Sequence, residues 1–191
     1  MTTAPSSPAD PVRILGLCGS LRKGSFNAAL LRAAAELLPE GATLSVADLA
    51  PLPMYNQDLE AGGYPEPVQA LRRSIAEADA ILFATPEHNF SIPAALKNAI
   101  DWASRGADQP LAGKPAAIMG ASPGMLGTGR CQMHLRQVLV FVDVHPLNKP
   151  EVLVARAHEK IDAEGRVTDE RTRQAIRSLL EALVGWTKRL R

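Results

Sequence analysis

The residues best suited to binding chemistry are concentrated in the stretch Gly19–Asn27, GSLRKGSFN. An apolar run precedes this stretch, and a helical pattern follows it. The first N–H groups of a helix have no partner inside the helix and lie at the positive end of its dipole, so such a junction binds anions. Four of its side chains can hydrogen-bond an anion: Ser20, Arg22, Ser25 and Asn27. We therefore predict a phosphate site, in which Gly19 and Gly24 allow tight turns; the alternative is a plain helix capped by Ser25.

Two further loops combine polar or glycine residues with a preceding apolar run. The loop 86–92, PEHNFSI, offers the amide of Asn89 and the rings of His88 and Phe90. The loop 122–130, SPGMLGTGR, offers small residues and accessible backbone N–H groups. Walls of this kind suit a flat heteroaromatic ring with polar edges.

No assembled set of catalytic side chains is evident in the sequence. The four histidines are scattered, none at metal-binding spacing from another, and there is no Gly-x-Ser-x-Gly or Walker motif. Cys18 and Cys131 form no CxxC pair, so we expect free thiols in a reducing cytoplasm. Binding loops without catalytic residues fit a cofactor that carries the chemistry itself, and we predict no metal site.

The elements that must position these loops alternate along the chain. Apolar runs predict strands over 12–18, 42–47, 79–85, 115–121 and, interrupted by two prolines, 144–154. Helical patterns lie over 28–38, 68–76, 94–105, 131–141 and 168–190. The alternation predicts an α/β fold: a flavodoxin-like, doubly wound, five-stranded parallel sheet of order 2-1-3-4-5 with helices on both faces. In that order the three loops share one edge, where the strand order reverses.

Length and charge narrow the class of protein. With 191 residues, one domain over 12–191 is expected, because domains run to about 100–200 residues. The polar, proline-rich segment 1–11 reads as a disordered tail and not as a signal peptide. A net charge of +1 argues against nucleic-acid or anionic membrane partners, and no apolar run reaches the roughly 20 residues of a membrane span. The segment 48–67 is long enough to be a lid or a mobile surface loop.

Three segments resemble the NADPH-dependent FMN reductase family, in its subgroup of quinone and chromate reductases that are also described as azoreductases. They are GSLRKGSFN (19–27), PEHNFSIPAALKNAIDW (86–102) and GASPGMLGTGRCQMHLRQVL (120–139). The resemblance spans about residues 12–155. It implies bound FMN, NADPH or NADH as co-substrate, and a homodimer or homotetramer. The cofactor-binding residues that it implies are Ser20, Arg22, Ser25, Phe26 and Asn27 for the phosphate and ribityl chain, Pro86, Glu87, His88 and Asn89 along the isoalloxazine, and Ser122, Pro123 and Gly124 on its other side.

Two positions depart from the family: His88 replaces a usual Tyr, and Ala94 stands where Gly is frequent. The implied activity is ping-pong hydride transfer from NAD(P)H through FMN to quinones or similar acceptors, such as chromate, azo compounds or free flavin, with no side chain as acid or base. Two alternatives stay open. The net charge of +1 disfavours a flavin-bearing electron carrier or sensor without strong turnover. The missing Gly-x-Gly-x-x-Gly pattern disfavours a non-flavin NAD-binding dehydrogenase.

Some side chains near these motifs have two interpretations. Arg130 could bind a phosphate of the nicotinamide nucleotide or contact a partner subunit. The Glu87 carboxylate could pair with a neighbouring subunit or be an ordinary exposed group. Asp48 ends a strand, where a ribose-binding acid could stand, but we favour a turn residue. We expect Cys131 to be a packing thiol.

Overall fold

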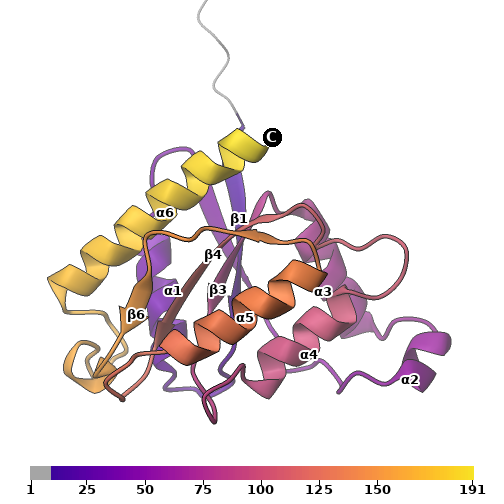
Figure 1. Cartoon of the computed structure of the whole chain (residues 1–191), viewed down its shortest axis with the longest axis horizontal. Coiled ribbons are helices and arrows are strands. Elements are labelled where there is room, and N and C mark those ends of the chain that lie inside the picture. The colour runs from indigo at the N-terminus through magenta and orange to yellow at the C-terminus, as the bar shows by residue number, and fades with distance from the viewer. Residues whose placement is uncertain (1–9) are drawn as a thin grey trace, which may run out of the picture.

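The computed structural model describes residues 10–191, so the tail expected over 1–11 lies almost entirely outside the described residues. A central sheet is covered by helices on both faces (Figure 1). The strands are β1 (Val12–Cys18), β2 (Ala42–Ala47), β3 (Ala80–Ala84), β4 (Pro115–Ala121), β5 (His145–Pro146) and β6 (Val152–Val154). The helices are α1 (Phe26–Glu36), α2 (Gln57–Ala61), α3 (Glu66–Glu77), α4 (Ala94–Ala103), α5 (Gly129–Phe141), α6 (Glu170–Leu190) and the short 3₁₀ helix η1 (Ala157–Glu159).

The sheet is parallel and has the order β2-β1-β3-β4-β5, which confirms the flavodoxin-like prediction. The expected fifth strand is divided in two. β5 pairs with the start of β4 at 115–116, and β6 pairs with its end at 119–121. Pro146 ends β5 and Pro150 lies in the gap, and a proline has no N–H to donate to a strand ladder.

Two apolar layers hold the sheet. α1 and α6 cover one face, where Leu30, Leu180 and Leu183 are buried against β4 and its neighbours. α3, α4 and α5 cover the other face, where Leu71, Leu96 and Leu135 are buried. All of β3 is buried, as expected for a central strand of a parallel sheet with both faces covered.

The segment 48–65, which we call the strap, packs onto α4. The indole Nε1 of Trp102 and the amide Nδ2 of Asn98 both donate to the Pro53 carbonyl, at 2.8 and 2.9 Å. Tyr55 and Tyr64 meet the Trp102 ring edge-on, with centroids 5.0 and 6.3 Å away. The strap contains the short helix α2, which the sequence patterns did not indicate, and which lies at the outer edge of the molecule beyond α4 (Figure 1). Asp48 is a turn residue, as expected, because its Oδ1 accepts from the Ala50 N–H at 2.9 Å.

Candidate functional site

The β1–α1 loop presents a row of free backbone donors. Across the part of the chain that the structure describes, no protein acceptor is hydrogen-bonded to the backbone N–H of any residue from 20 to 27. The Ser25 hydroxyl caps α1 by accepting from the Ala28 N–H at 3.2 Å. Arg22 is exposed on the same loop, and Ser20 is half-buried. Backbone amides at a helix start, with an arginine on the same loop, suit a phosphate group, so the loop is suited to more than capping.

Asn27 contributes differently from the expectation. Its side chain is 2% exposed and forms a pair of bonds with the last residue of β4: Nδ2 donates to the Ala121 carbonyl at 3.0 Å, and Oδ1 accepts from the Ala121 N–H at 2.9 Å. The amide thus ties α1 to β4. Phe26 is half-buried and packs against the apolar layer that α1 and α6 form with the sheet.

The loop 86–91 is a tight hairpin. His88 and Ser91 exchange two backbone hydrogen bonds, of 3.1 and 2.8 Å. The central residues Asn89 and Phe90 have φ values of 49° and 65°, the sign that a type I′ turn requires at both positions. Asn tolerates this conformation, whereas Phe rarely adopts it. His88 and Asn89 are exposed at this turn, and Pro86 is half-buried beside it.

Glu87 joins the hairpin to α5. Its side chain is 7% exposed; Oε1 accepts from the Arg130 guanidinium at 2.7 and 2.8 Å, and Oε2 accepts from the Cys131 N–H at 3.1 Å. The Arg130 guanidinium also lies 3.4 Å from the centroid of the Phe90 ring. We call this arrangement the Glu87–Arg130–Phe90 stack. The Glu87 carboxylate therefore pairs within its own chain, which was not among the expectations from sequence.

The β4–α5 loop is held by its own hydroxyl and by a segment farther along the chain. The Ser122 hydroxyl donates to the Gly127 carbonyl and accepts from the Gly124 N–H at 3.2 Å. Beyond β6, the Arg156 N–H donates to the Gly124 carbonyl at 3.1 Å, and the Ala157 N–H donates to the Ser122 carbonyl at 3.0 Å. Pro123 and Gly124 are exposed. No sequence pattern predicts these contacts. The unusual backbone of Arg156, with a φ of 49°, is evident only in the structure.

Cys131 is a packing thiol, as expected. It is buried, with its Sγ 3.3 Å from Thr85 Oγ1. Burial, with a smaller contribution from the charge of Glu87, raises its pKa to about 11 against the opposing hydrogen bond with Thr85. The thiol is therefore neutral at physiological pH and a poor nucleophile. Among the residues described, no three potential ligands gather as a metal site would require.

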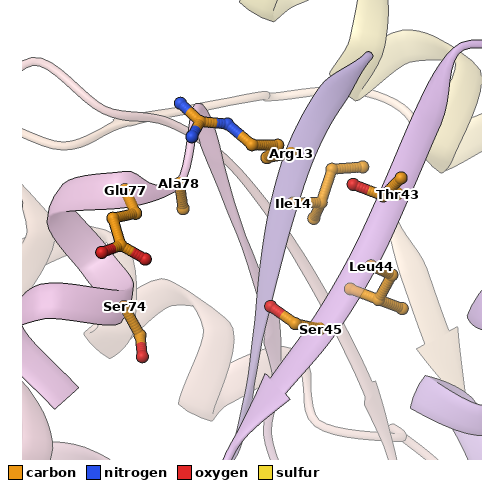
Figure 2. A pocket seen from close by; sticks show the side chains of 8 residues that line it. All are labelled: Arg13, Ile14, Thr43, Leu44, Ser45, Ser74, Glu77 and Ala78. Atoms are coloured by element: carbon orange, nitrogen blue, oxygen red, sulfur yellow. The ribbon is translucent and has the colours of Figure 1, made fainter. Parts of the chain in front are cut away.

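The predicted site residues lie at the carboxyl edge of the sheet, on three neighbouring loops and, for Phe26 and Asn27, in the first turn of α1. Backbone bonds interlock the strand ends there: Gly19 N–H donates to Ala84, Thr85 N–H to Met119, and Ser122 N–H to Val154. A cavity of about 270 Å³ lies elsewhere, between α3 and the amino halves of β1 and β2, where Arg13 and Glu77 face it (Figure 2). We place the site at the carboxyl edge, because ligands of open α/β sheets bind there and the free donors are there.

Comparison with known proteins agrees with this geometry. A sequence model of the NADPH-dependent FMN reductases matches residues 12–159. An NAD(P)H-dependent FMN reductase of Pseudomonas aeruginosa is 53% identical over 96% of this chain and 99% of its own length. A quinone reductase of Escherichia coli is 40% identical over 96% and 99%. The solved structure of the flavoenzyme NAD(P)H:(acceptor) oxidoreductase FerB from Paracoccus denitrificans superposes with a TM-score of 0.84 at 37% identity, covering 93% of this chain and 97% of that one. The chain therefore belongs to the NADPH-dependent FMN reductase family, as an oxidoreductase whose cofactor is FMN and whose reductant is NAD(P)H.

Proposed function

We propose that this oxidoreductase reduces quinones with NAD(P)H in a ping-pong cycle, and that chromate, azo compounds and free flavin are alternative acceptors. The observation that carries the proposal is the row of N–H donors at 20–27, which have no protein acceptor within residues 10–191 and are adjacent on one edge to the hairpin and to the 122–124 loop. Relatives named as quinone reductases in bacteria and plants support the acceptor class. The same names argue against a carrier without turnover.

We propose three groups of contacts for FMN. The backbone N–H groups of 20–27, the Ser20 hydroxyl and the Arg22 guanidinium would bind the phosphate. Ser25, Phe26 and Asn27 would contact FMN through their backbones. Their side chains are engaged within the protein: Ser25 caps α1, Phe26 packs on the core and Asn27 is hydrogen-bonded to Ala121. The residues expected to line the ring are Pro86, Glu87, His88 and Asn89 on one side and Ser122, Pro123 and Gly124 on the other.

FMN, when bound, supplies the hydride and electron chemistry between NAD(P)H and the acceptor. The chain would bind and orient it and would provide no acid or base. Two observations support a chain that binds FMN and supplies no acid or base. The Glu87 carboxylate is already engaged by Arg130 and by the Cys131 N–H, and the Cys131 thiol is neutral near pH 7.

Exposed apolar side chains around the edge suit a flat apolar acceptor. Leu21, Phe90, Met125 and Leu126 all lie on the three loops and are exposed.

We also propose that the chain forms a homodimer or homotetramer in the cytoplasm. An exposed apolar face of α5 supports self-association, and the two free cysteines are compatible with a reducing compartment. No helix within residues 10–191 is long and apolar enough to cross a membrane.

The decisive experiment combines a spectrum with kinetics. We expect the purified protein to be yellow or to take up FMN on reconstitution, and Arg22→Ala to weaken FMN binding at least about tenfold, the effect of losing about 1.4 kcal/mol. Arg189→Ala, at the far end of α6, is the matched control and should bind FMN normally. Ser25→Ala is a poorer test, because loss of the cap destabilises α1 by about 1 kcal/mol.

The kinetic part tests the ping-pong cycle. With NADPH and a quinone varied together, double-reciprocal plots should be parallel; intersecting lines would exclude the ping-pong cycle.

A further inference from the structure

Arg156 lies on the same edge of the sheet as the candidate site, just beyond β6. Its backbone has φ 49° and ψ 49°, a left-handed conformation that residues other than glycine rarely adopt. Its N–H donates to Gly124, and the next N–H, of Ala157, donates to Ser122. The strained residue is thus fixed against the loop that we propose lies along the flavin ring.

The Arg156 side chain is turned over that loop and is largely free. Its Nε lies 3.1 Å from Met125 Sδ, and a thioether is a weak acceptor. Within residues 10–191 the only carboxylate within 4.0 Å is Glu159, with Nη1 and Oε1 at that limit, and the side chain is 52% exposed. His158, the other titratable group beside it, is 3.7 Å from the same Glu159 oxygen. The guanidinium therefore keeps most of its donors for a ligand.

The phosphate of FMN already has donors in the β1–α1 loop, where the backbone N–H groups of 20–27 and the Arg22 guanidinium would bind it. Arg156 lies instead against the 122–124 loop, to which its own N–H and that of Ala157 are hydrogen-bonded. The other cation considered for the nicotinamide nucleotide, Arg130, is occupied by Glu87 and Phe90. Among the residues described, the cation left for a second anionic ligand beside the 122–124 loop is therefore the Arg156 guanidinium.

We propose that Arg156 binds a phosphate of the nicotinamide dinucleotide, an inference that rests on the proposed function. NADH and NADPH share a pyrophosphate, and NADPH adds a 2′-phosphate; a guanidinium binds either as a planar fork. Arg156 acts on binding only, so it is a specificity residue for the reductant and takes no part in the transfer.

The test measures binding of the unreactive oxidised dinucleotides to the FMN-loaded protein. Arg156→Gly removes the cation and suits the left-handed backbone, so the loop keeps its shape. Arg156→Lys keeps the charge, and Arg189→Ala is the control for loss of a distant surface arginine. For NADP⁺ we expect the Kd to rise about tenfold in Arg156→Gly, about threefold or less in Arg156→Lys, and not at all in the control. The FMN content of all variants should equal that of the wild type.

The NAD⁺ titration distinguishes the two phosphates. If the Kd for NAD⁺ rises by the same factor, Arg156 binds the pyrophosphate; if only NADP⁺ is affected, it binds the 2′-phosphate. In turnover, the KM for NADPH should rise while kcat at saturation stays the same. Unchanged Kd values for both dinucleotides in FMN-loaded Arg156→Gly would overturn this inference alone. A wild-type protein that takes up no FMN would instead overturn the proposed function, and this inference with it.

Discussion

Glycines in or next to the site loops look alike in sequence but have different structural roles. A Cβ on Gly19 would lie 2.7 Å from Pro93 Cγ, so Gly19 lets the first loop approach the hairpin loop. A Cβ on Gly120 would overlap Thr128 Oγ1 and the Thr85 carbonyl oxygen. Among residues 10–191, no heavy atom lies within 4 Å of such a Cβ on Gly24, so these residues do not require glycine there. A requirement at Gly24 would come from the ligand.

The comparison of Gly24→Ala with Gly120→Ala tests this difference. We expect Gly120→Ala to destabilise the fold by about 1–3 kcal/mol, the usual effect of overpacking a filled site. Gly24→Ala should leave the free energy of unfolding within about 0.5 kcal/mol of the wild type, as surface changes do, but should weaken FMN binding. Urea denaturation of the apoprotein and an FMN titration separate the two effects. Unchanged FMN affinity in Gly24→Ala would show that the ligand does not approach this position closely.

At the scale of elements, Asp79 joins three of them at the amino edge of the sheet. It lies just before β3, and its carboxylate accepts from the N–H and side chain of Arg13 on β1 and is 2.7 Å from Arg191 at the end of α6. Burial acts to raise the Asp79 pKa, but the hydrogen bonds from Arg13 and Arg191 outweigh it and hold the pKa below its usual value. The carboxylate is thus favoured in the folded state.

This shift makes a pH-dependent contribution to stability. Because the folded pKa lies below the unfolded value of about 3.9, the contribution is present above that pH and is lost as the pH falls through the folded pKa. We expect Asp79→Asn to lower the free energy of unfolding at pH 7, and the difference from the wild type to shrink below about pH 4. Urea denaturation at several pH values measures both. A difference that stayed constant down to pH 3 would contradict this account.

The hairpin loop depends on another element in the same way. Phe90 holds a φ of 65° while the Arg130 guanidinium covers its ring, and Glu87 fixes that guanidinium at the start of α5. The Glu87–Arg130–Phe90 stack therefore couples the shape of the hairpin to the position of α5. The strap similarly depends on α4, through Asn98 and Trp102.

On the scale of the whole molecule, one surface of α5 is unusually apolar. Val140 and Phe141 are 79% and 82% exposed, and Met133, about two helical turns earlier, is 63% exposed. Their spacing places them on one side of the helix. Exposed apolar patches of this kind mark interfaces, so this face supports the proposed self-association.

A double variant, Val140→Glu with Phe141→Glu, tests that role. Burying two carboxylates against a second copy is unfavourable, so we expect a lower mass in solution, with little change in the stability of one subunit. Light scattering after size-exclusion chromatography measures the mass. Glu170→Gln, exposed on α6, is a control that should leave the mass unchanged. A wild-type protein that is monomeric at micromolar concentration would contradict the proposed oligomer.

The sequence by itself determined the strands, most helices, the sheet order and the edge that carries the loops. It could do so because strand and helix periodicities are local, and parallel βα connections leave one arrangement of loop ends. Only the tertiary structure decided which side chains in those loops are free. The Asn27 side chain is hydrogen-bonded to Ala121, 94 residues away, and the Glu87 carboxylate to Arg130, 43 residues away. Side-chain type states what a residue can bind, but its partner is set by packing between distant segments. The same packing divided the last strand and fixed Arg156 against the 122–124 loop.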